Sequence, residues 1–85
     1  MKAYLIEIQT MRHIFTTISI AESEDMAIAL VAVKIHKQKK LQKLNYRTGE
    51  FEVIEVKGLY KINGIKRVIT YNKPGEGEFV KENEQ

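Results

Sequence analysis

The dipeptide Asn63-Gly64 constrains the fold of this chain more than any other local feature. It lies between KGLYKI and IKRVITY, two segments with β-branched and aromatic residues. Asn-Gly favours the type I′ turn that joins two antiparallel strands, because both central residues of that turn need a positive φ. The sequence therefore predicts a hairpin over residues 58–71, in which Ile62 lies opposite Ile65 and Leu59 lies opposite Val68.

Two more strands are predicted near the N-terminus, over residues 3–8 and 13–20. In the first, Tyr4, Ile6 and Ile8 alternate with less uniformly apolar residues, and in the second the isoleucines alternate with Phe15 and hydroxyl residues. Alternation with a period of two is typical of a half-buried strand. The short link between the segments makes them a second predicted hairpin.

A helix is predicted to begin at Ser23 or Glu24. The Ser23 hydroxyl can accept a hydrogen bond from an early helical N–H, and the acidic residues after it suit the positive end of the helix dipole. The helix either stops near Gln38 or continues to about Leu44. One broad face is the predicted core stripe, at positions 27, 30, 31, 35, 38, 41 and 44.

These elements define the expected architecture. The predicted fold class is α+β with the order ββαββ, as one antiparallel sheet with a single helix packed on one face. Residues 1–73 form the single α+β domain, and residues 74–85 form an acidic tail that we expect to be flexible.

Composition and motifs exclude several function classes. The chain has no cysteine, so it can form neither a disulfide nor a zinc-thiolate site. Its longest apolar run, residues 26–33, is far shorter than the roughly 20 residues of a membrane span. No nucleophile elbow, phosphate loop or metal-ligand spacing occurs. We therefore expect a cytoplasmic protein without membrane contact, cofactor, metal or catalytic residues.

Charge is concentrated in the stretch KIHKQKKLQKLNYR, residues 34–47, which contains no acidic residue. Such a field attracts phosphates or an acidic protein surface. If the helix continues, His36, Lys39, Lys40 and Lys43 line its outer face and can follow a nucleic-acid backbone without reading its sequence. Alternatively, the lysines only complement the helix dipole and keep the protein in solution. The predicted basic partner-binding residues are Lys34, His36, Lys37, Lys39, Lys40, Lys43 and Arg47.

A second candidate surface is the sheet face opposite the predicted helix. It is more apolar than a solvated face needs to be, and a contiguous apolar patch often marks an interface. Its predicted partner-binding or homodimer residues are Phe15, Phe51, Val53, Leu59 and Val68. Alternatively, the C-terminal tail folds back over this face through Phe79 and Val80.

The N-terminal part has the opening MKAYLIEIQ, a second strand, and then IAESEDMAIA entering a helix. Over residues 1–35 this pattern resembles small proteins of phages and other mobile elements, including some small anti-CRISPR proteins. The resemblance implies a non-enzymatic interaction protein that binds and modulates or inhibits a host nucleic-acid-handling machine. The alternative is a sequence-tolerant nucleic-acid-binding protein that uses residues 34–47.

Overall fold

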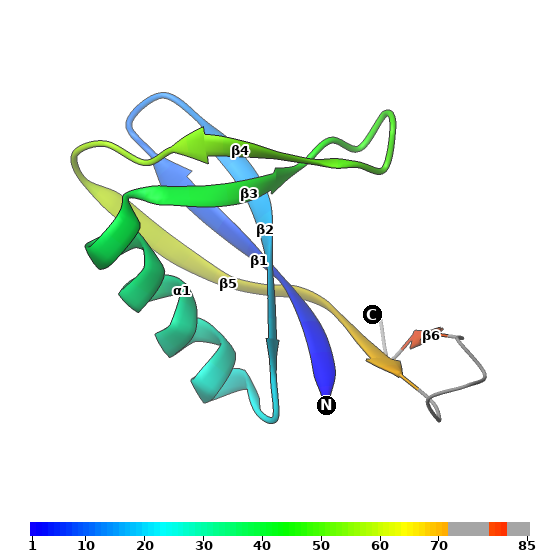
Figure 1. Ribbon diagram of the computed structural model, residues 1–85. Helices are drawn as coiled ribbons and strands as arrows, with labels where there is room; N and C mark the ends of the chain where they lie inside the picture. The colour runs from blue at the N-terminus through cyan, green and yellow to red at the C-terminus, as the bar shows by residue number, and fades with distance from the viewer. Residues whose placement is uncertain (72–78, 82–85) are drawn as a thin grey trace.

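The chain folds as an α+β protein in which a hairpin precedes the helix and further strands follow it (Figure 1). The computed structural model describes residues 1–71 and 79–81. Its elements are β1 (Lys2–Thr10), β2 (Ile14–Ala21), α1 (Glu24–Gln38), β3 (Lys40–Leu44), β4 (Phe51–Glu55), β5 (Tyr60–Tyr71) and β6 (Phe79–Lys81). The α+β class, the strand order around the helix and the helix on one face of an antiparallel sheet are confirmed. The tail predicted over residues 74–85 lies outside the described residues, apart from β6.

The strands form two sheets. A four-stranded antiparallel sheet has the order β2-β1-β5-β6, and β3 pairs with β4 in a separate two-stranded sheet. In Figure 1 the β3–β4 hairpin crosses one end of the larger sheet, above the C-terminal end of α1. The β3–β4 hairpin was not predicted from the sequence, and the second part of the basic stretch, from residue 40 onward, lies in it.

The helix packs on the large sheet through one narrow stripe. Ser23 caps its N-terminus by accepting a hydrogen bond from the Met26 N–H, so the predicted helix start is confirmed. Ala27, Val31 and Ile35 are buried against the sheet. The Ser19 hydroxyl donates to the Ala27 carbonyl at 2.9 Å, which ties β2 to the helix.

Phe15 belongs to this core and not to the opposite face of the sheet, so its predicted place was wrong. The β1–β2 register pairs Ile8 with Phe15. Residues directly opposite each other in an antiparallel pair point to the same face. Phe15 therefore joins Ile8 under the helix, whereas Ile14 and Ile20 are exposed.

β5 runs without a turn through Asn63-Gly64, so the predicted hairpin at this dipeptide was wrong. The strand pairs with β1 over most of its length, from Lys2 opposite Thr70 to Thr10 opposite Tyr60. Gly64 has a φ of 140°, which differs from the φ of about +60° of a left-handed turn residue. The long-range pairing with β1 therefore outweighs the local turn preference.

Two β-bulges in β5 set which side chains reach the core. Register shifts leave Asn63 and Lys66 without a partner residue in β1. Ile62, Ile65 and Val68 consequently lie on the helix face at a spacing of three, and all three pack against the core. Val68 was predicted on the opposite face, and the bulges explain why that assignment was wrong.

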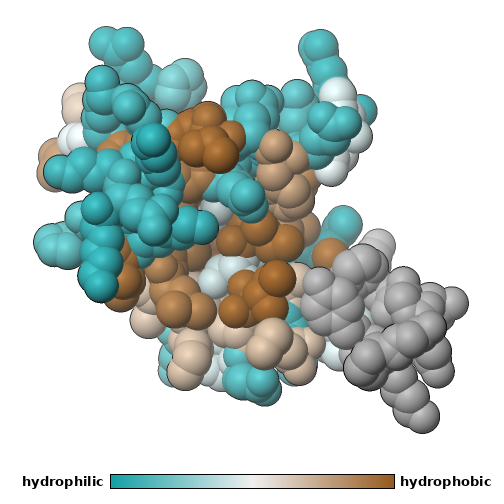
Figure 2. Space-filling view, viewed as in Figure 1, coloured by the Kyte–Doolittle hydropathy of each residue, from teal (hydrophilic) through white to brown (hydrophobic). Residues whose placement is uncertain are grey.

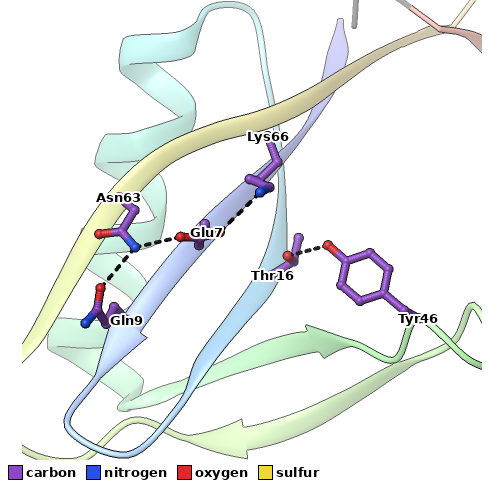
Figure 3. A network of polar contacts seen from close by, with 6 residues as sticks. All are labelled: Glu7, Gln9, Thr16, Tyr46, Asn63 and Lys66. Atoms are coloured by element: carbon purple, nitrogen blue, oxygen red, sulfur yellow. Dashed lines mark hydrogen bonds and ion pairs between the residues drawn. The ribbon is translucent and has the colours of Figure 1, made fainter. Parts of the chain in front are cut away.

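The two bulge residues reach a carboxylate on the opposite face of the sheet (Figure 3). Asn63 Nδ2 donates to Glu7 Oε2 at 2.7 Å and to Gln9 Oε1 at 3.2 Å. Lys66 Nζ lies 3.3 Å from Glu7 Oε1. The hydrogen bond from Asn63, and then the hydrogen bond and charge of Lys66, lower the pKa of Glu7 below its ordinary value of 4.5.

The helix ends at Gln38, the earlier of the two predicted ends. Lys39 adopts the left-handed conformation, with a φ of 55°, and its N–H donates to the Ile35 carbonyl at 2.9 Å. β3 begins at the next residue. The predicted helical row of His36, Lys39, Lys40 and Lys43 is therefore not formed, because half of it lies on a strand.

The β3–β4 hairpin is held against the edge strand β2 at two points. Leu41 is buried in the common core. Near the other end of the hairpin, the Tyr46 and Thr16 hydroxyls form a hydrogen bond of 2.6 Å (Figure 3). The hairpin therefore covers the part of β2 near Thr16 and leaves the part near Ile20 open.

Candidate interaction surface

A groove lies where α1, the edge strand β2 and β3 meet. Its volume is about 450 Å³. In the space-filling view, apolar side chains gather between the helix and the small hairpin, with hydrophilic side chains along the helix side (Figure 2). The lining residues are Ile18, Ser19, Ile20, Leu30, Val31, Val33, Lys34, Lys37, Gln38, Leu41 and Gln42. We refer to this feature as the α1–β2 groove.

The helix contributes a second stripe to this groove, beside its buried one. Leu30, Val33, Lys34 and Lys37 recur at intervals of three and four residues, so they share one flank of the helix. Leu30 remains 46% exposed and Val33 49% exposed, and Ile20 on β2 is 45% exposed. Half-exposed aliphatic side chains on adjoining elements form a contiguous apolar surface that a partner can cover.

The charged side chains that line the α1–β2 groove are all positive. Lys34 and Lys37 line it, and no carboxylate among the described residues does so. Within residues 1–71 and 79–81, neither lysine forms an ion pair or a side-chain hydrogen bond. The groove therefore offers an apolar surface beside two unpartnered ammonium groups.

The groove continues as a smaller depression toward β4. This depression has a volume of about 140 Å³ and is lined by Lys34, Gln38, Lys40, Leu41, Gln42 and Val53. Val53 is 65% exposed. The structure thus brings together four of the predicted binding residues at one concave surface, namely Lys34, Lys37, Lys40 and Val53.

The other predicted basic residues, His36, Lys39, Lys43 and Arg47, do not line this concave surface. Lys40 lies opposite Glu55 in the β3–β4 pair, and Lys43 lies opposite Glu52. His36 and Lys39 line a separate depression near the C-terminal end of the helix, together with Ile35, Val56, Lys57, Gly58 and Tyr60. Arg47 lies in the link between β3 and β4, where Asn45 Oδ1 accepts from its N–H at 2.9 Å. The basic stretch of the sequence therefore does not form one positive surface.

The predicted apolar sheet face is not assembled as one patch. Phe15 and Val68 pack with the core under the helix. Phe51 is an exposed residue of β4, and Leu59 is 79% exposed in the link before β5. Of the five predicted residues, only Val53 lines the depression that continues the groove.

Apart from the core residues Val31 and Leu41, four apolar groove residues were not among the predicted binding residues: Ile18, Ile20, Leu30 and Val33. Leu30 was assigned to the buried helix stripe, whose buried members are Ala27, Val31 and Ile35. A helix with a second apolar stripe next to the first signals a second contact, and this pattern was present in the sequence. The exposed edge of β2 could not be inferred, because it depends on which strand ends the sheet.

Comparison of the chain with protein-family models, curated proteins and solved structures finds no match. Within the described residues, α1 is too short and too polar to cross a membrane. The same residues hold no group of three or more histidine, aspartate or glutamate side chains placed to bind a metal ion. The α1–β2 groove is therefore the candidate site on which the functional argument rests.

Proposed function

We propose that this chain is a small non-enzymatic interaction protein that binds another protein through the α1–β2 groove. The observation that carries the proposal is the juxtaposition of half-exposed Leu30 and Val33 with two lysines, Lys34 and Lys37, that have no ion-pair partner in the described part of the chain. Burial of apolar surface supplies affinity, and a complementary carboxylate supplies specificity and a faster association.

A protein partner fits the groove better than nucleic acid does. A sequence-tolerant nucleic-acid site needs a positive track for phosphates, often with aromatic side chains on which bases stack. Here acidic residues of β4 oppose Lys40 and Lys43, and the described residues that line the groove include aliphatic side chains but no aromatic one. Aliphatic surface beside a few charges is typical of a protein interface.

The class of partner follows from the resemblance of residues 1–35 to small phage and mobile-element proteins. On that basis we propose a host nucleic-acid-handling machine as the target, which the chain modulates or inhibits by occupying one of its surfaces. The localisation that suits this proposal is the cytoplasm.

The test is affinity capture from a host-cell lysate with matched surface variants. Leu30→Glu places a charge in the groove, and Met11→Glu makes the same change at an exposed apolar residue outside it. We expect wild type and Met11→Glu to retain the same partner after nuclease treatment, and Leu30→Glu to lose it.

Two results would contradict this proposal. Loss of the captured material on nuclease treatment would indicate nucleic-acid binding. Equal capture by Leu30→Glu and wild type, with loss in Leu59→Glu, would move the interface to the β4–β5 link. Circular dichroism of each variant establishes that it is folded.

A further inference from the structure

We infer that the occupant of the α1–β2 groove is an extended, acidic segment of the partner that adds as a strand to the free edge of β2. This inference rests on the proposed function and specifies its binding mode. The bound segment pairs with β2 through its main chain, packs apolar side chains against α1, and places a carboxylate near Lys34 and Lys37.

Among residues 1–71 and 79–81, no strand pairs with the outer edge of β2, which is the last strand on its side of the sheet. β3 packs against it but does not pair with it in either described sheet. An edge strand carries unpaired N–H and C=O groups, which form a template for another strand. Proteins that bind peptides by strand addition use such an edge, with pockets beside it for alternate side chains.

The hairpin geometry identifies the residues that offer these groups. At the closed end, the Thr10 N–H donates to the His13 carbonyl at 2.8 Å. Hydrogen-bonded and non-hydrogen-bonded pairs alternate along an antiparallel ladder. The alternation directs the backbone groups of Thr17 and Ser19 toward β1 and those of Ile18 and Ile20 outward. Both isoleucines line the groove.

The length of the free edge limits the occupant. The Thr16–Tyr46 hydrogen bond of 2.6 Å holds the β3–β4 hairpin over the first half of β2. Residues from Ile18 to Ala21 remain, which at roughly 3.3 Å per residue allow a paired segment of about four residues. A short strand of this kind gains most of its affinity from side chains that contact the groove.

Charge argues for an acidic segment over a second copy of this chain. A copy added through its own β2 would bring its own Lys34 and Lys37 to the same edge, where the first pair is already unpartnered. Like charges in close contact disfavour association, whereas a carboxylate gains a charge-assisted hydrogen bond.

The decisive measurement is amide hydrogen exchange by NMR, in the free protein and in complex with the captured partner. In the free protein we expect the Ile18 and Ile20 amides to exchange faster than those of Thr17 and Ser19. On binding, the Ile18 and Ile20 amides should slow by about tenfold or more, because they acquire main-chain acceptors. Unchanged exchange at both isoleucines in a saturated complex would overturn strand addition.

A displayed library of random eight-residue peptides provides a probe that does not depend on the natural partner. We expect selected peptides to alternate β-branched residues with Asp or Glu and to lack proline at their centre. Lys34→Glu/Lys37→Glu should weaken the best peptide by about tenfold or more. Arg12→Glu/Lys61→Glu, with the same change in net charge outside the groove, should not. Enrichment of basic or helix-forming peptides, or of none, would contradict the inference.

The remaining outcomes separate this inference from the proposed function. Suppose that capture resists nuclease and needs Leu30, but the amides of Ile18 and Ile20 do not exchange more slowly in the complex. This result would support the proposed function and contradict strand addition. A concentration-dependent dimer in light scattering that Leu30→Glu abolishes would replace the acidic segment with a second copy. If the protein binds the selected peptides but captures no cellular protein, the strand-addition site is supported and the proposed function is contradicted.

Discussion

The lysines of α1 and the lysines of β3 come from one uninterrupted basic stretch, yet only those of β3 have carboxylate residues opposite them in a strand pair. Lys34 and Lys37 stand on the helix flank beside apolar surface, without a carboxylate partner among the described residues. Lys40 and Lys43 lie on a strand, directly opposite Glu55 and Glu52. Only Lys39, the C-terminal cap of the helix, separates the end of α1 from the start of β3.

This contrast shows that charge density along the sequence does not define a charged surface. Opposite charges directly across a strand pair attract each other and reduce the field that a distant partner meets. The positive potential of Lys34 and Lys37 is not reduced by a carboxylate opposite them among the described residues. The apolar side chains around them favour a partner that buries apolar surface there. The groove is therefore the better binding surface, although it carries no more lysines than β3 does.

The largest expected effect concerns Leu41, which fixes the boundary between the two regions. Its side chain is only 2% exposed, and it packs with Ile35 and Val56 in the core. Leu41→Ala should lower the free energy of unfolding by about 2–4 kcal/mol, through lost burial and the cavity left behind. Urea denaturation measures this change.

Val53→Ala is the control for Leu41→Ala, because Val53 belongs to the same hairpin but is largely exposed. It should change the free energy of unfolding by less than about 0.5 kcal/mol. Equal effects of the two substitutions would show that the hairpin is not anchored through Leu41.

The next effect concerns Tyr46, which holds the far end of the hairpin on β2. Tyr46→Phe removes the hydrogen bond to the buried Thr16 hydroxyl and should cost about 1–2 kcal/mol of unfolding free energy. Thr16→Val in the same background should recover part of the loss, since it removes the unsatisfied hydroxyl. A double-mutant cycle by chemical denaturation measures the coupling, and additive effects would contradict the contact.

Much of this fold could be predicted from local patterns. The β1 alternation placed Tyr4, Ile6 and Ile8 in the core, and Ser23 with its acidic neighbours located the helix start. Asn63-Gly64 misled the prediction, because pairing of β5 with β1 and two bulges override a two-residue turn preference. The residues Asn63 and Gly64 alone do not indicate that this segment pairs with a strand from the other end of the chain.

The site was predictable only in part. The basic stretch indicated Lys34 and Lys37, and Val53 was predicted as a member of an apolar sheet face that does not form as one patch. The remaining wall comes from Ile18 and Ile20, whose exposure depends on β2 being the edge of the sheet. The glutamates opposite Lys40 and Lys43 depend on the β3–β4 register. Neither strand order nor this register follows from periodicity alone.

Charge reversal on β3 tests whether its lysines are neutralised as the register implies. Lys40→Glu/Lys43→Glu places carboxylates opposite Glu55 and Glu52 and should cost about 1 kcal/mol of unfolding free energy at low salt. Added salt should reduce this cost by screening. The matched variant Lys43→Glu/Glu52→Lys restores one opposite-charge pair without disturbing the ion pair between Glu55 and Lys57, and it should be less destabilised than Lys43→Glu alone. No difference between them would contradict a contribution from the cross-strand charges.

A smaller, stabilising effect is expected at Lys39, where the helix changes to the strand. A non-glycine residue in the left-handed region carries a steric cost, and Gly relieves it while adding entropy to the unfolded chain. The net effect of Lys39→Gly should be a gain of about 0.5 kcal/mol in unfolding free energy. Lys37→Gly, inside the last helical turn, should lose about 1 kcal/mol. Thermal unfolding compares the two, and destabilisation by Lys39→Gly would show that its side chain contributes more than its conformation costs.

The smallest effect concerns Glu7 and Lys66, which form an ion pair on the sheet face opposite the helix. Because the folded-state pKa of Glu7 lies below its ordinary value of 4.5, the ionised carboxylate stabilises the fold. This contribution is complete above the unfolded-state pKa and is lost as the pH falls below 4.5 through the folded-state value. Glu7→Gln should therefore lower stability at neutral pH and flatten its decline in acid. Asn63→Ala removes the largest cause of the lowered pKa and should flatten the same part of the curve. Urea midpoints measured between neutral pH and pH 3 test this, and an acid decline that is as steep in Glu7→Gln as in wild type would assign the acid sensitivity to other carboxylates.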